Sequence, residues 1–469
     1  MYQNSILFYF CILLVFGCEH SQDLVKFDSR DLLIKTSFTV ADFEPSSECE
    51  SCHPTHYKEW SGSMHAYAFT DPVWFKQHSK EQEHFNSKDK ELGQFCIMCH
   101  SPVGFLTGAI EDPYTFDISQ KESLAPQVKE GVSCSFCHAT THLSPSTNVD
   151  FSNNINEGIQ FFLNPGDVKY GSIKDPLPNN FHESEFHPGY DKSEYCRACH
   201  NLTISGRDAE MTFNEWSQTS FEAMGIECQS CHMESYSGYA VDTELFPNAP
   251  YRKNLHRHNF IGIDHALTPF PEEETQLKSI NDLLESAAEL NFSEILPDYI
   301  LSGEIFNLGI IVTNTSGHNL PTGTTFSRQI WLELNVLADL DTIYRSGHLD
   351  SNGDLYDFYI DPQRLEDPDL TIFRTVLYDA NGDSGLRHVS VERMVKKSDT
   401  TLPVQGSIIA NFKFTIPENT ENLIIKVRLR FRSLPPFFVR EFGLAEEEKK
   451  LNIFNGDSLS AVIPVRTLN

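Results

Sequence analysis

The sequence predicts an α+β protein with more than one domain, in which a mostly irregular, short-helical domain is followed by a C-terminal β-sandwich. Two observations support this fold class. Residues 46–270 show no sustained helical or strand periodicity and are rich in histidine, aromatic residues and proline. Beyond them, short apolar or alternating runs are separated by turn residues, which is typical of a sandwich of short strands.

The chain starts with a predicted export signal over residues 1–17. Its apolar run is too short to span a bilayer as a helix and has the length of a signal-peptide core. Gly17 before Cys18 resembles a bacterial lipobox, in which the cysteine becomes lipidated. Phe16 is bulky for its position and no Lys or Arg precedes the run, so ordinary cleavage or a retained anchor are the alternatives. We expect a lipoprotein anchored at Cys18, with a linker over 18–45.

Five copies of the pattern Cys-x-x-Cys-His lie within residues 46–270. In this pattern two thiols add across the vinyl groups of a haem, and the adjacent imidazole binds the iron from one side. Ten of the 12 cysteines are used, so a disulfide framework is not expected. The sequence therefore predicts five covalently attached haem c groups. The motifs are Cys49, Cys52 and His53; Cys96, Cys99 and His100; Cys134, Cys137 and His138; Cys196, Cys199 and His200; and Cys228, Cys231 and His232.

Zinc knuckles or a redox CxxC pair are the competing interpretations of these cysteines. Zinc sites need paired ligand sets at recurring separations. Here the separations are irregular, and a histidine follows each pair at the same offset. We therefore prefer haem. Few residues are available for each haem, so we expect the haems to pack against each other and to serve as the core of a pentahaem domain over 46–270.

The C-terminal part is predicted to start with a connecting helix over 271–293. Leu277, Ile280 and Leu284 lie on one stripe of an amphipathic helix that extends to Leu290. The β-sandwich is assigned to 294–469. Because no haem motif falls there, we expect a docking or scaffold module. The predicted strands are Ile305–Thr313, Ile330–Leu337, Leu370–Leu377, His388–Val395, Ile408–Ile416 and Leu423–Arg432.

Histidines outside the motifs are candidates for the second axial ligand of each iron. His65 follows the first motif within Trp60–Ala66, where a helix leaving one haem can deliver an imidazole to a neighbour. His182, His258 and His142 are further candidates. Each could instead be solvated or hydrogen-bonded. The competing histidines are His56, His78, His84, His187, His256 and His265.

Several segments resemble the multihaem family built around cytochrome c-554, the electron acceptor of hydroxylamine oxidoreductase. They are CESCHPTHYKEWSGSMHAYA, YGSIKDPLPNNFHESEF before CRACHN, TFNEWSQTSFEAMGIECQSCHM and the following HNFIG. The resemblance covers most of residues 46–262. It implies that His65, His182 and His258 are distal haem ligands. The fifth motif and the appended domain depart from simple tetrahaem carriers, which leaves the partner and pathway open.

The β-rich part resembles a C-terminal module attached to some of these cytochromes. The similarity lies in NTSGHNLPTG, SGHLD and VRLRFRSLPP. His318 lies in the first of these segments. We expect it to reach the haem domain as a further axial ligand, with a turn-stabilising role as the alternative.

Charge and motif content narrow the function. A formal net charge of −30 argues against binding to nucleic acid or, by charge, to anionic lipid, and favours redox proteins with basic docking surfaces. We expect electron transfer between extracytoplasmic partners, in the periplasm or at the outer membrane, with membrane contact only through the lipid.

Two other functions stay open. The first is an oxidoreductase acting on a small nitrogen or sulfur compound at a haem with an open coordination site. No CxxCK motif exists, so the lysine-ligated active haem of pentahaem nitrite reductases is absent. The second is haem-based sensing or binding, in which the β-domain would bind a partner or a polysaccharide.

Overall fold

The structure is a computed structural model that describes residues 38–86, 95–110, 118–144, 160–204, 207–357, 366–381 and 396–467. Helices and strands are both present, which confirms the predicted α+β class. The predicted leader, Cys18 and the predicted strand His388–Val395 lie outside the described residues. Within those ranges, no helix has the length and apolar character needed to cross a bilayer.

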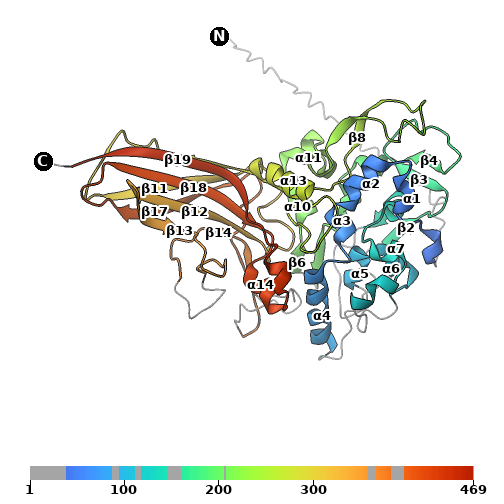
Figure 1. Ribbon diagram of the computed structural model, residues 1–469, viewed down its shortest axis with the longest axis horizontal. Coiled ribbons are helices and arrows are strands. Elements are labelled where there is room, and N and C mark those ends of the chain that lie inside the picture. The colour runs from blue at the N-terminus through green and yellow to red at the C-terminus, as the bar shows by residue number, and fades with distance from the viewer. Residues whose placement is uncertain are drawn as a thin grey trace, which may run out of the picture. The chain divides into compact units, whose positions relative to one another are not determined.

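Residues 38–270 fold into short helices and small two-stranded sheets (Figure 1). Four helices begin at a proline, whose fixed φ suits the first helical position. Residues 212–224 form two helices rather than one, because the Thr219 hydroxyl accepts the N–H of Phe221 and caps a new helix. The helices are α1 Ser47–Glu50, α2 Pro54–Ser61, α3 Met64–Tyr67, α4 Pro72–Asn86, α5 Phe95–His100, α6 Pro102–Thr107, α7 Pro126–Lys129, α8 Cys134–Ala139, α9 Glu194–Arg197, α10 Thr212–Trp216, α11 Ser220–Met224 and α12 Cys228–His232, with 3-10 turns at Val40–Asp42, Ile118–Ser123 and Pro188–Asp191.

The strands of this region pair only locally. β3 and β4 are parallel, and the other three pairs are antiparallel. Sheets of two strands have little face to bury, so they do not form a core of their own. The strands are β1 Thr140–Ser144, β2 Gln160–Leu163, β3 Val168–Gly171, β4 Glu183–Phe186, β5 Leu202–Ile204, β6 Arg207–Glu210, β7 Ser235–Gly238 and β8 Arg252–His256.

The largest hydrophobic cluster of this region is small. It contains buried residues between Phe43 and Leu163, among them Phe69, Ile97 and Val128. Phe43 belongs to the cluster and is 1% exposed. The packed region therefore begins before residue 46, within the stretch assigned to the linker 18–45.

The connecting helix is shorter than predicted. Helix α13 spans Glu273–Glu285, and strand β9, Ala288–Phe292, follows directly. Ala288 and Leu290 are buried as alternate residues of β9, which pairs with β11, Ile305–Asn314. The extension of the helix to Leu290 was thus wrong. The spacing of the apolar residues at this point fits both the periodicity of a helix and the alternation of a strand. The pairing with β11 shows that the segment is a strand.

The β-rich part contains a six-stranded and a three-stranded sheet (Figure 1). The first has the order β10-β19-β18-β12-β13, with β14 also paired to β12, and the second has the order β17-β11-β9. β13 and the 13-residue β19 were not predicted, and Leu370–Leu377 is divided into β14 and β15, which pair with different partners. The remaining elements are β10 Ile300–Leu301, β12 Gln329–Ala338, β13 Asp341–Ser346, β14 Ile372–Phe373, β15 Thr375–Tyr378, β16 Lys396–Asp399, β17 Ser407–Thr415, β18 Asn422–Arg432, α14 Pro436–Glu441, α15 Ala445–Glu448 and β19 Phe454–Arg466.

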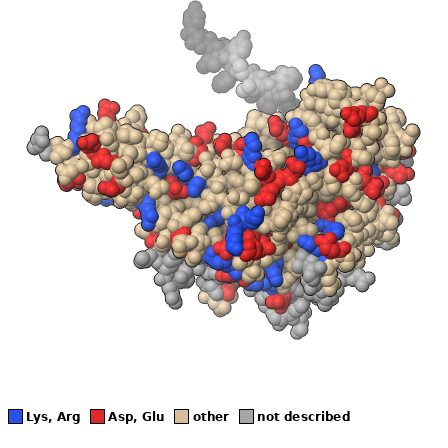
Figure 2. Space-filling model, in the orientation of Figure 1, with Lys and Arg blue, Asp and Glu red and all other residues tan. Residues whose placement is uncertain are grey.

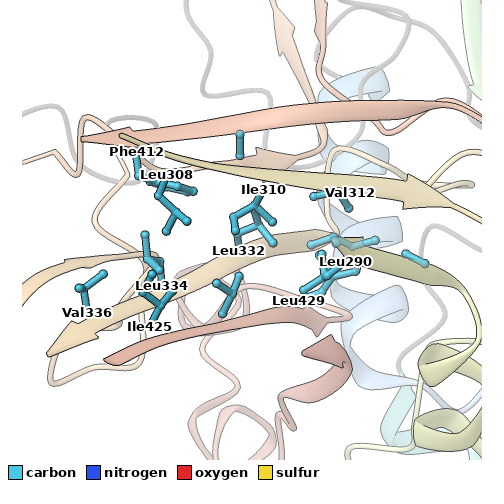
Figure 3. Packing of buried hydrophobic residues seen from close by; sticks show 14 of the residues in the cluster. Leu290, Leu308, Ile310, Val312, Leu332, Leu334, Val336, Phe412, Ile425 and Leu429 are labelled. Carbon is cyan, nitrogen blue, oxygen red and sulfur yellow. The ribbon is translucent and has the colours of Figure 1, made fainter. Parts of the chain in front are cut away.

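Alternate residues of both sheets are buried in one hydrophobic cluster (Figure 3). On β11 the buried positions include Leu308 and Ile310, and on β12 they include Leu332 and Leu334. The register brings buried residues together, since Leu332 lies opposite Leu429 of β18. Residues of the two sheets therefore share one hydrophobic core, while the β-sandwich itself stays a prediction.

Candidate haem-binding sites

Each Cys-x-x-Cys-His motif lies in or directly after a helix of one or two turns. In the first motif the backbone N–H of His53 donates to the carbonyl of Cys49 at 2.8 Å, and in the fourth that of His200 donates to Cys196 at 3.0 Å. Residues three and four apart lie on one face of a helical turn. Each motif therefore presents its thiols and imidazole on one side, as attachment of a porphyrin requires.

Four of the five motif histidines lie opposite a second imidazole ring. The ring planes of these pairs differ by 15° to 37°. One ring of each pair comes from a motif and the other from a different part of the chain. The ring centroids are separated by 6.3 Å in His53–His182, 6.4 Å in His65–His200, 6.3 Å in His138–His258 and 6.3 Å in His232–His318.

This separation fits an iron held between two imidazoles. A metal–imidazole bond is about 2.0 Å long, and with about 1.1 Å from each nitrogen to its ring centre the two centroids lie about 6.2 Å apart. His56 is also 6.2 Å from His53, but it is three residues away in the sequence and its Nε2 bonds to the hydroxyl of Tyr236 at 3.0 Å. His182 is therefore the better partner of His53.

The hydrogen bonds of six of the eight paired rings leave the opposite nitrogen for a metal, whereas Nδ1 of His65 is buried without a hydrogen-bond partner among the described residues. Nδ1 of His53 lies 2.7 Å from the carbonyl oxygen of Ala240, and Nδ1 of His138 lies 2.6 Å from that of Tyr170. An Nδ1–H that donates to a carbonyl fixes the tautomer with a lone pair on Nε2, which is the usual second-shell arrangement of ligating histidines. The same contact is made by His100 with Ala68, His232 with Ile261, His258 with His256, His318 with Asn319 and His182 with Glu183.

Burial favours the neutral form of several of these imidazoles, since it lowers their pKa. Desolvation lowers the pKa of His65 to about 3 and those of His100 and His318 to about 4. Burial likewise lowers the pKa of His138 and His232. A neutral imidazole is the form that binds a metal.

Two buried serines bring motifs together in pairs. The Ser46 hydroxyl accepts the backbone N–H of Cys134 at 3.2 Å, and the Ser193 hydroxyl accepts that of Cys228 at 2.9 Å. Each serine lies three residues before the first cysteine of its own motif, and each is fully buried. The first motif is thus joined to the third and the fourth to the fifth. The sequence analysis missed this role, although the shared spacing was visible.

Thiols of different motifs also lie close to each other. The thiols of Cys49 and Cys134 lie close enough to shift each other's pKa, and so do those of Cys196 and Cys228. The Cys99 thiol likewise lies near that of Cys199, and burial together with the nearby Cys199 raises the pKa of Cys137 to about 12. The fourth motif therefore contacts the second, third and fifth motifs, whereas the first contacts the third.

The second motif has a different environment. The ring of His100 stacks on Trp74 at 4.3 Å, and Trp74 in turn stacks on His78 at 5.6 Å. Among the side chains that the structure describes, no histidine ring is recorded at about 6.3 Å from His100. The second motif therefore differs from the other four in the rings around its histidine, although its Cys99 thiol lies beside Cys199 of the fourth motif and the buried His78 lowers the pKa of His100.

The predicted candidates differ in where the structure places them. His65, His182, His258 and His318 each lie opposite a motif histidine, and His318 reaches its partner from the β-rich part. His142 is exposed on β1, with its ring 5.5 Å from that of Phe162. It belongs to none of the four pairs, so its ligand role stays a prediction.

Gly131 sets the position of the segment that carries His65. Its φ is +69°, and a Cβ atom there would lie 2.2 Å from the His65 carbonyl oxygen, which also accepts the N–H of Val132. We expect Gly131→Ala to destabilise the fold by about 3 kcal/mol or more, since backbone strain and a clash add. Gly108→Ala is the matched control, because Gly108 has φ +64° with nothing within 4 Å. Equal thermal midpoints of the two variants would contradict this.

Part of the chain matches a known sequence family. Residues 48–139, which contain the first three motifs, match the family described as cytochrome c554 and c-prime. No curated protein matches the chain.

The fold is shared with a solved multihaem protein. The penta-heme cytochrome c552 from Thermochromatium tepidum is 17% identical, with a TM-score of 0.57, and the match covers 90% of this chain and 99% of that one. AvmM, which catalyses macrocyclization in alchivemycin A biosynthesis, matches 38% of this chain and 89% of its own at 13% identity with a TM-score of 0.19. The CARDB domain of a Pyrococcus furiosus protein matches 38% of this chain and 86% of its own at 10% identity with a TM-score of 0.16.

The motifs, the family match and the shared fold agree. The chain is a multihaem c-type cytochrome with covalently bound haem c, and its general role is electron transfer. The proteins of this class are typically extracytoplasmic.

Proposed function

We propose that the chain binds five haem c groups and carries electrons between redox proteins outside the cytoplasm. The observation that carries this proposal is the set of four histidine pairs whose ring centroids are 6.3 to 6.4 Å apart. Bound haem supplies one-electron chemistry at a potential that its axial ligands set. The ligand pairs are His53 with His182, His200 with His65, His138 with His258 and His232 with His318.

The contacts between motifs suit a carrier. Each of the five motifs has a thiol close to a thiol of another motif, so their attachment sites are adjacent rather than isolated by protein. The fourth motif contacts three others and forms the junction of this set. The β-rich part supplies His318, which makes it part of a haem site in addition to the docking or scaffold role predicted for it.

The partner is proposed to be a redox protein with a basic docking surface, because the chain has a formal charge of −30. On the face in Figure 2, acidic and basic side chains are interspersed, so the proposed attraction comes from the overall excess of acid rather than from one patch on this face. We propose a location in the periplasm or at the outer membrane, with lipid at Cys18 as the only membrane contact.

Electron paramagnetic resonance of the ferric protein tests the ligand assignment. Iron held by two imidazoles is low-spin, so we expect low-spin signals that integrate to at least four haems per protein. Integration to fewer than four low-spin haems in the intact protein would contradict the four pairs.

A second function is favoured by the environment of the second motif. His100 stacks on Trp74, and no ring pair like the other four is recorded for it among the described residues. Its iron is the candidate for an open coordination site, provided that the buried His78, which lies close enough to lower the pKa of His100, does not bind it. We propose, as the alternative, an oxidoreductase that acts at this site on a small nitrogen or sulfur compound. His100 would bind the iron, with its Nδ1 held by the carbonyl of Ala68 at 2.8 Å.

Ligand titration separates the two functions. If the second motif is open, the ferric protein has one high-spin signal that cyanide, nitrite or hydroxylamine converts. A spectrum with five low-spin haems that none of the three changes supports the carrier and contradicts the oxidoreductase. Trp74→Phe, which keeps an aromatic ring beside His100, should change the converted signal and no other.

A further inference from the structure

The sequence Glu-Trp-Ser occurs twice in the part of the chain that carries the motifs. Glu59-Trp60-Ser61 ends helix α2, and Glu215-Trp216-Ser217 lies at the end of α10. Both tryptophans are buried, at 6% and 7% exposure. The two copies make the same set of contacts with different parts of the molecule.

Each tryptophan holds the chain just before a haem motif. Nε1 of Trp60 donates to the carbonyl of Val132 at 2.8 Å, and Nε1 of Trp216 donates to that of Ile226 at 2.9 Å. Val132 lies two residues before Cys134, and Ile226 lies two residues before Cys228. The first copy is thus hydrogen-bonded to the segment just before the third motif, and the second copy to the segment just before the fifth.

Glu59 holds the segment that carries the proposed distal histidine of the third motif. The backbone N–H of His258 donates to Oε2 of Glu59 at 2.9 Å, and Arg257 donates to Oε1 at 2.6 Å. His258 is the ring opposite His138, which belongs to the third motif. Glu59 and Trp60 therefore contact both segments that provide ligands to one iron.

Glu215 holds the segment that carries the proposed distal histidine of the fifth motif. Its carboxylate accepts the backbone N–H of Asn319 at 3.1 Å, the side-chain amide of Asn319 at 3.0 Å and the hydroxyl of Thr322 at 2.6 Å. His318, next to Asn319, is the ring opposite His232 of the fifth motif. In addition, a Cβ at Gly317 would lie 3.6 Å from Trp216, so this loop packs on the tryptophan.

We propose that the two Glu-Trp pairs are copies of one positioning unit, in which the tryptophan fixes the motif with the proximal histidine and the glutamate fixes the distal histidine. The inference rests on the proposed function of His258 and His318 as ligands. Hydrogen bonds to a carboxylate are stronger than neutral ones, and two adjacent residues on one helix define the distance between the two ligand segments.

The test uses the full holoprotein and a spectroscopic measurement. Glu215→Ala removes three hydrogen bonds from the loop of His318, and we expect one low-spin haem of the ferric protein to become high-spin and to bind cyanide. Glu215→Gln keeps one acceptor oxygen and should restore most of the low-spin signal. Glu222→Ala, an exposed glutamate of the neighbouring helix α11, is the matched control and should leave the spectrum unchanged.

Glu59→Ala tests the other copy. This substitution should convert a different haem from low-spin to high-spin. The double variant Glu59→Ala/Glu215→Ala should therefore lose two low-spin haems. His318→Ala and His258→Ala provide the spectra expected for complete loss of each ligand. If those variants change the spectrum and both glutamate variants do not, the positioning role is wrong while the ligand assignment stands. If the histidine variants themselves leave the spectrum unchanged, the ligand assignment fails.

Discussion

Replacing His258 with methionine is expected to raise one midpoint potential of the holoprotein while leaving the others close to their values. His258 lies opposite His138, and a thioether favours ferrous iron more than an imidazole does. Axial ligands change haem potentials over roughly 0.8 V, and we expect a rise on the order of 0.1 V or more for this one exchange. A spectroelectrochemical redox titration measures it.

His265→Met is the matched control for this substitution. His265 is also buried, but its Nε2 contacts the carbonyl of Lys450 at 3.0 Å and its ring contacts Phe454 rather than a motif histidine. The control should leave every midpoint in place. An unchanged titration of His258→Met, with full haem content, would remove His258 from the ligand set.

The second large effect is expected when the fourth motif loses its thiols. The double substitution Cys196→Ser/Cys199→Ser should remove one haem and destabilise the fold, because this motif contacts the second, third and fifth motifs. Several hundred Å² of apolar surface would lose its partner, which is on the order of 10 kcal/mol at about 25 cal/mol per Å². Pyridine haemochrome absorbance should fall by one-fifth, together with a large drop in the thermal midpoint.

The first motif offers a control that also loses one haem. Its described thiol contact is with Cys134 alone. We expect Cys49→Ser/Cys52→Ser to give the same one-fifth loss of absorbance with a smaller drop in the thermal midpoint. Equal midpoints for the two double variants would argue against a central position of the fourth motif.

The haem-attachment residues were predictable because the chemistry requires them to be adjacent. Two thiols and an imidazole must reach one porphyrin, so Cys49, Cys52 and His53 form a local pattern. The resemblance to a known family then pointed to His65, His182 and His258. What the sequence could not provide was which rings face each other, because His232 and His318 are far apart in the chain and meet only through tertiary folding.

Other features were missed for similar reasons. Trp74 looked like an ordinary aromatic residue, and its place against His100 depends on how α4 packs beside α5. The end of α13 was misplaced because Leu290 fits both a helical stripe and an alternating strand, and only its pairing with β11 separates the two. Glu59 and Glu215 share a visible Glu-Trp-Ser context, but the role that we propose for them depends on their hydrogen bonds to His258 and Asn319, which only the tertiary structure shows.

Attachment of five haems is the claim on which the other assignments depend, and intact-mass spectrometry tests it most directly. The protein is produced in a host that matures c-type cytochromes and is measured after denaturation, which removes any haem that is not covalently bound. We predict the mass of the processed polypeptide plus five haems. The mass of the polypeptide alone would contradict the account.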